Sequence, residues 1–155
     1  MAFNLTELKQ IVEDKQTKAN DAHENFINTC LNVFKSQLNS EIFEDNLQEL
    51  LQERMCIRFT CDYRYNQRAI YISKYGANIS DKYLIDLSFD CDVNEAIYNC
   101  DYCYDDSDIE YLSKICFELF KDKMESLGLL LKNEPESFKS CYDNYNQTDI
   151  YVTFK

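Results

Sequence analysis

The stretch MCIRFTCDYRY, residues 55–65, marks the point at which the sequence changes from a helical period to a strand period. Its apolar and aromatic positions are Met55, Ile57, Phe59, Cys61, Tyr63 and Tyr65, and the positions between them are Cys56, Arg58, Thr60, Asp62 and Arg64. Successive side chains of a strand point to opposite faces of a sheet. The alternation therefore predicts a strand with one face in the core and the other face more polar.

Two further strands are expected directly after this one. Asn66 and Gln67 are turn residues before AIYISKY (69–75), and GANISD (76–81) contains the turn residues before YLIDLSFD (83–90). Short connections of this kind join antiparallel neighbours. The three strands are therefore predicted to form an antiparallel meander.

Before the strands, the apolar residues recur every three or four positions, which is the period of an amphipathic helix. Asn4 followed by Glu7 is a capping-box-like start. The stripe consists of Leu5, Leu8, Val12, Ala19, Ala22, Phe26 and Val33, and Lys15 interrupts it. We predict a helix over residues 4–38 that packs on the chain's own sheet, loosely at its middle, QTKANDAH. The same heptad spacing also suits a coiled-coil homodimer.

A second helix is predicted from Ser40, a capping residue, to about Arg54. Its apolar side consists of Phe43, Leu47, Leu50 and Leu51. A third helix is predicted over residues 107–127, because Ser107 and Glu110 form a capping box and Gly128 follows as the C′ residue.

The C-terminal part adds shorter elements. LLLKN (129–133) is expected to be a strand, Pro135 to open a helical turn through Tyr142, and TDIYVTFK (148–155) to form a final alternating strand. Two helices, a meander, one long capped helix and two further strands in the same sheet predict a single α+β domain over residues 1–155. This order resembles that of type III secretion chaperones, although it has an extra second helix and no C-terminal helix.

The chain has 28 acidic and 16 basic residues and a formal net charge of −12, which makes direct binding to nucleic acid or to an anionic membrane surface unfavourable. The charge favours a basic protein partner. With acidic residues and no apolar run in its first fifteen residues, the chain carries no recognisable signal peptide, so a cytoplasmic location is expected. Its eight cysteines would then be reduced thiols.

No catalytic motif is recognisable, and we expect neither enzymatic activity nor a cofactor. His23 is the only histidine and falls on the predicted long helix. The two glycines, Gly76 and Gly128, are too few and too far apart for a phosphate-binding loop or a dinucleotide fingerprint.

Metal binding is one alternative function. Cys100 and Cys103 form one CxxC, which Cys91 and Cys116 would have to complete as a zinc site, although the spacing is irregular. The paired aspartates Asp90 with Asp92 and Asp106 with Asp108 are the alternative, a carboxylate site for Mg²⁺ or Ca²⁺.

The strongest functional signal is an acidic stretch without lysine or arginine between Lys82 and Lys114. Tyrosines interleave with its acids, as in many protein interfaces, although a charge run is also typical of a plain solvated surface. The predicted contact residues are Asp90, Asp92, Tyr98, Asp101, Tyr102, Tyr104, Asp105, Asp106 and Asp108.

These features together predict a protein that binds and inhibits a basic, nucleic-acid-binding protein such as a nuclease, with the acidic surface mimicking nucleic acid. A phage anti-defence protein of the anti-CRISPR or anti-restriction type and a toxin-immunity protein are the settings that fit. A secretion-type chaperone that holds an extended effector segment is the alternative from another class.

Overall fold

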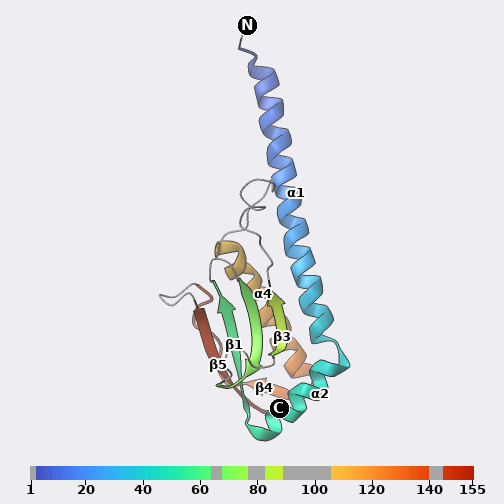
Figure 1. The fold of residues 1–155 in the computed structure, drawn as a ribbon, viewed down its shortest axis with the longest axis vertical. Coiled ribbons are helices and arrows are strands. Elements are labelled where there is room, and N and C mark those ends of the chain that lie inside the picture. Colours follow the sequence, from blue (N-terminus) through green and yellow to red (C-terminus); the bar gives the residue numbers. More distant parts are fainter. Residues whose placement is uncertain (1–2, 64–67, 77–82, 89–105, 140–144) are drawn as a thin grey trace.

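The computed structural model describes residues 3–63, 68–76, 83–88, 106–139 and 145–155. Its elements in chain order are α1 (Leu5–Leu38), α2 (Glu41–Glu53), β1 (Cys56–Asp62), β2 (Ala69–Lys74), β3 (Tyr83–Ser88), α4 (Asp106–Ser126), β4 (Leu129–Leu131) and β5 (Tyr145–Phe154). Figure 1 shows them as helices set against one sheet. The predicted α+β architecture is confirmed.

The sheet has five strands in the order β3-β2-β1-β5-β4, and every neighbouring pair is antiparallel. The predicted meander forms one half of it. The last strand, β5, returns to pair with β1, with Phe59 opposite Thr148 and Ile57 opposite Ile150. The strand predicted from the switch to period two is therefore the central strand of the sheet.

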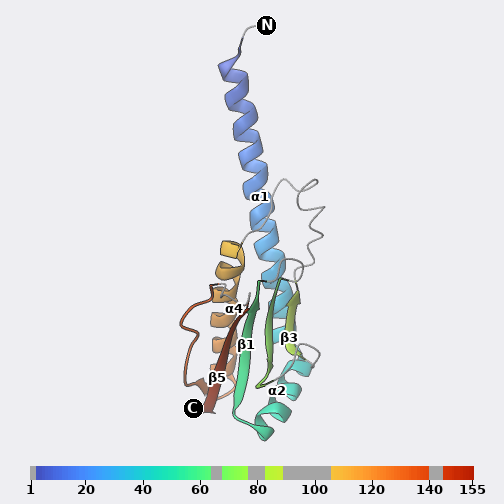
Figure 2. The same cartoon turned by 60° about the vertical axis from the view of Figure 1, so that its left-hand side comes forward.

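The core lies between the sheet and the helices. Ile57 and Phe59 of β1 point toward α4, where the ring of Phe59 meets that of Phe117 edge-on at 5.5 Å. Phe138, from the segment between β4 and β5, packs against both rings. Figure 2, turned by 60° from Figure 1, shows the sheet in front and α1 and α4 behind it. Helices therefore cover one face of the sheet, as predicted.

Two side-chain amides extend the hydrogen-bond ladder where a strand has no neighbour. Gln37 of α1 donates to the carbonyl of Asp86 on the edge strand β3 (2.8 Å) and accepts from its N–H (3.0 Å). Asn133, after the short strand β4, donates to the carbonyl of Asp149 (2.6 Å) and accepts from the N–H of Tyr151 (2.8 Å) on β5. Each amide occupies backbone groups that would otherwise be available to another chain.

The helix ends follow the predicted capping residues. The side chain of Asn4 accepts from the N–H of Glu7 (3.0 Å) at the start of α1, and Ser40 does the same for Phe43 (3.2 Å) at the start of α2. Gly128 follows α4 with φ of +84°, in the left-handed region that glycine adopts without strain.

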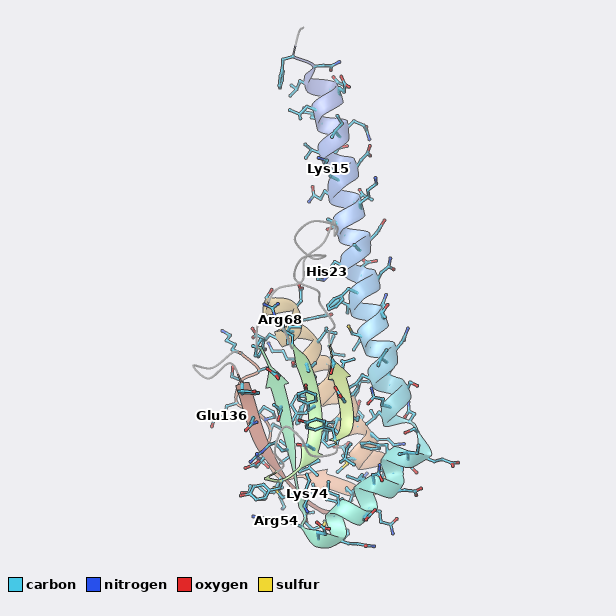
Figure 3. The ribbon with its side chains drawn as sticks, in the orientation of Figure 1. Lys15, His23, Arg54, Arg68, Lys74 and Glu136 are labelled. Carbon is cyan, nitrogen blue, oxygen red and sulfur yellow. The ribbon has the colours of Figure 1, made fainter. Side chains whose placement is uncertain are left out.

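α1 consists of a part that packs on the body and a part that projects from it. Its buried residues are Ile27, Cys30, Phe34 and Leu38. All side chains from 3 to 18 are exposed. Figure 3 shows the difference, with Lys15 on the projecting turns and His23 near the height at which the helix reaches the body.

The prediction that the α1 stripe packs on the chain's own sheet is therefore wrong for the N-terminal half of the helix. The sheet is too short to reach these turns. In the C-terminal half the core face is also displaced by one residue from the predicted stripe: Phe34 is fully buried, whereas Val33 is 44% exposed. One residue is about 100° around a helix, so the buried face is turned away from the predicted stripe, of which Phe26 alone packs half-buried against the core.

Two smaller predictions are corrected. α4 begins at Asp106, one residue before the predicted start at Ser107. The helical turn expected from Pro135 is absent from residues 135–139, where the chain runs irregularly. Phe138 explains this, since its ring is drawn into the core and its carbonyl accepts a hydrogen bond from the hydroxyl of Tyr63.

Candidate protein-binding surfaces

Most of the predicted acidic contact surface lies outside the described residues. This applies to Asp90, Asp92, Tyr98, Asp101, Tyr102, Tyr104 and Asp105. Asp106 is the first residue of α4, and Asp108 lies in its first turn. The contact surface as a whole therefore stays a prediction.

Asp108 connects two helices. Its carboxylate lies 3.5 Å from Nδ1 of His23 on α1, and its side chain is only 12% exposed. Tyr111, one turn further along α4, is 53% exposed and lines a shallow hollow of about 520 Å³ between the two helices. A partner could reach Tyr111 directly, but it could reach Asp108 only by displacing His23.

The most acidic helix among the described residues is α2, which the sequence interpretation treated only as a packing helix. It carries five acidic residues and no lysine or arginine in thirteen positions. Glu44 is paired with Lys123 (2.8 Å) and Glu53 with Lys74 (2.6 Å), and these two carboxylates are therefore partly neutralised.

The other three acids share the outer side of α2. Glu41, Asp45 and Glu49 follow one another at intervals of four residues, and Ile42, which is 70% exposed, lies among them. No ion pair is formed by these three carboxylates within the part of the chain that the structure describes. We call Glu41, Ile42, Asp45 and Glu49 the acidic face of α2. In the sequence this face is indicated by five acidic residues, and no lysine or arginine, between residues 41 and 53.

This arrangement works against the stability of α2. Like charges four residues apart on a helix destabilise it by about 0.2–0.5 kcal/mol per pair. The helix macrodipole favours Glu41 in the first turn, but it gives no such advantage to Glu49 near the other end. The macrodipole therefore does not account for Asp45 and Glu49.

An apolar hollow lies on another side of α2, where the helix meets the end of the sheet. Its volume is about 470 Å³. The apolar residues that line it are Leu47, Leu51, Met55, Leu127, Leu129 and Phe154. Phe154, at the end of β5, is 76% exposed. A ring left this open at the mouth of an apolar hollow can pack on an aliphatic or aromatic side chain from a partner.

Two of the described arginines, Arg54 and Arg58, are in contrast held by an aromatic ring and by an acid. Nε of Arg58 donates to the carboxylate of Asp149 (2.9 Å), and the guanidinium of Arg54 lies 3.9 Å from the centre of the Tyr75 ring. Arg58 is therefore paired with an acid, and Arg54 is stacked on an aromatic face.

The described cysteines are buried thiols. Cys116 is fully buried near Cys30 and Cys61, and burial is the main cause that raises its pKa. Burial also raises the pKa of Cys30 to about 11, and the Cys61 thiol lies 3.2 Å from the hydroxyl of Ser113. Raised pKa values disfavour the thiolates that zinc requires.

No group of side chains in the described ranges has the composition and geometry of a metal site. Of the predicted zinc ligands, Cys91, Cys100 and Cys103 lie outside those ranges. The four-cysteine set therefore stays a prediction, in which Cys116 would have to leave the core to bind metal.

In the ranges that the structure covers, no helix combines the length and the apolar character needed to cross a membrane. Comparison with protein families, with characterised proteins and with solved structures finds no significant match.

Proposed function

We propose that this protein is a non-enzymatic acidic protein that binds and inhibits a basic, nucleic-acid-binding protein. The acidic face of α2 carries this proposal, because it exposes, around Ile42, three carboxylates that form no ion pair with the described residues, at a cost to the helix itself. A row of like charges lowers the stability of the free protein, but this repulsion is removed in a complex with a basic partner that neutralises the charges.

The net charge of −12 would accelerate the encounter with such a partner at low ionic strength. In the complex, Asp45 and Glu49 would accept hydrogen bonds from lysine or arginine, and Ile42 would supply the apolar anchor. The regular spacing of the carboxylates along one helix side suits a surface that otherwise holds a phosphate backbone. Inhibition would follow from occupation of that surface, as in an anti-restriction, anti-CRISPR or immunity protein acting in the cytoplasm.

The test is a pull-down with the wild-type protein and the D45N/E49Q variant, followed by direct binding measurements on the captured partner. The variant should bind at least about tenfold more weakly, which corresponds to about 1.4 kcal/mol, and its affinity should depend less on salt. A control variant, E118Q/E125Q, removes the same charge from exposed positions of α4 and should bind like the wild type. Equal losses in both variants would reduce the effect to net charge and contradict a specific site.

The predicted acidic stretch is tested separately with a D101A/D105A/D106A variant. Asp108 is left intact, because its removal would also break the contact with His23 and alter how α1 lies on α4. Loss of binding in this variant would extend the contact surface to the start of α4.

A second candidate function is suggested by the apolar hollow beside α2. An extended effector segment could place an apolar side chain against Phe154 and Met55, as expected of a secretion-type chaperone. Binding of this kind would survive high salt and would be lost in Phe154→Ala, whose ring is too exposed to support the core. A nuclease in the eluate would favour the inhibitor, and a secreted effector would favour the chaperone.

A further inference from the structure

The projecting part of α1, residues 5–22, carries an apolar stripe that is exposed over its first turns and half-buried where it reaches the body. We call this segment the arm. Leu5, Leu8 and Val12 are 54%, 43% and 53% exposed, and the half-buried Ala19 and Ala22 continue the stripe toward the body. At 1.5 Å per residue the arm is about 27 Å long. An isolated helix of this length is only marginally stable in water, so a partner that covers the stripe would stabilise it.

The spacing of the stripe indicates what kind of partner fits. Its positions follow a repeat of three and four residues without a break from Leu5 to Phe26, with Lys15 in one seam position. Beyond the arm the same spacing reaches Phe26, which packs against the core, and Val33, which is 44% exposed. A seam with a mean spacing of 3.5 residues is matched by another helix with the same spacing.

Charge indicates that this helix is a second copy of the arm. The arm, residues 5–22, contains three lysines and four acidic residues, a net charge of −1, so −11 of the net charge of −12 lies in the remainder of the chain. Two arms therefore repel each other only weakly, whereas two bodies repel each other strongly. An antiparallel pair places the bodies at opposite ends of the arms, about 27 Å apart, which exceeds the screening length of about 8 Å at physiological ionic strength.

Side-chain size fits the same arrangement. When two arms run antiparallel with residues 5 and 22 opposed, Leu5 faces Ala22, Leu8 faces Ala19 and Val12 faces Lys15 of the second copy. Large residues then meet small ones, which allows close packing. The Lys15 stem can cover Val12 while its ammonium group remains in water. We propose that the chain forms an antiparallel dimer through its arms, independently of the function proposed above.

Sedimentation velocity of the full chain over a range of concentrations tests this proposal. L8E/V12E places two charges in the seam and should weaken dimerisation by at least about 100-fold. T6E/T17E adds the same charges at exposed positions off the stripe and should dimerise like the wild type. K15L removes the charged seam residue and should tighten the dimer about tenfold.

Both glutamate variants change only exposed residues, so their urea midpoints, measured where the protein is monomeric, show whether the body is intact. Small-angle scattering of the dimer should give an elongated particle with its mass at two ends. A dimer with adjacent bodies would overturn the antiparallel arrangement. A wild-type chain that remains monomeric at about 100 µM, or one whose arm binds anionic vesicles instead, would overturn the proposal.

Discussion

The two halves of α1 should respond very differently to the same kind of truncation. Phe34 is fully buried against the core, and Phe34→Ala should lower the free energy of unfolding by about 3–5 kcal/mol. Leu8 is 43% exposed on the arm, and Leu8→Ala should change it by less than about 0.5 kcal/mol, since alanine is at least as good a helix former as leucine. For a chain of this size the first change lowers Tm by about 6–20 °C.

Urea denaturation followed by circular dichroism measures both effects. The protein must be dilute enough for its unfolding midpoint to be independent of concentration, because association through the arm would otherwise contribute to the cost of Leu8→Ala. If the two variants were equally destabilised in dilute solution, the division of α1 into a packed and a projecting half would be refuted. A large effect of Leu8→Ala that appears only at high concentration would instead agree with the arm being an interface.

Three further predictions test local features of the fold. Gln37→Ala removes both hydrogen bonds to the backbone of Asp86, and it should cost about 1 kcal/mol and accelerate hydrogen exchange of the Asp86 amide; unchanged exchange would contradict the capping of β3. Gly128→Ala should cost about 1–2 kcal/mol in urea unfolding through backbone strain alone, because an added Cβ would meet no atom within 4 Å. Cys30 ionises near its ordinary pKa of 9.0 in the unfolded chain, whereas burial raises its pKa in the folded protein to about 11, so the free energy of unfolding should fall as pH rises between these values. In Cys30→Ala the urea midpoint should decline less steeply with pH than in the wild type. Equal slopes in the two proteins would contradict the burial of this thiol.

The periodicity of the sequence was sufficient to predict where the sheet and the helices lie. Ile57 and Phe59 alternate in β1, Ser40 caps α2, and Gly128 ends α4. These signals depend only on residues close together in the sequence, so they predict an element without knowledge of what it packs against. The prediction that β1 buries only one face is wrong, because Cys56, Thr60 and Asp62 on its other face are buried as well.

Periodicity could not show which apolar face of α1 meets the body. The stripe through Val12 and Val33 is as regular as the face through Ile27 and Phe34, so the period alone does not determine which of them is covered. The roles of Gln37 and Asn133 were equally hidden, because an amide that completes a strand ladder has no sequence period.

The acidic face of α2 was visible in composition but was overlooked, because the longer run after Lys82 has a stronger contrast of charge. The structure shows which of the described acids in these two regions are paired. In α4, Asp108 is occupied by His23, whereas Asp45 and Glu49 remain unpaired in the described chain. Pairing therefore distinguishes acids that stabilise the fold from acids that are free to meet a partner, and a count of charges does not.

The two proposed surfaces lie at opposite ends of the molecule, and this has a consequence for binding. The arm is at one end of α1 and α2 follows the other end (Figure 1). In an antiparallel dimer the acidic faces of the two α2 helices would lie about 75 Å apart, since each α1 is about 51 Å long and the arms overlap. The dimer could then hold two basic partners without contact between them. A partner that repeats at a similar distance, such as an oligomeric or filament-forming nuclease, would be bound more tightly by the dimer than by a monomeric L8E/V12E variant, because the second contact forms within the complex.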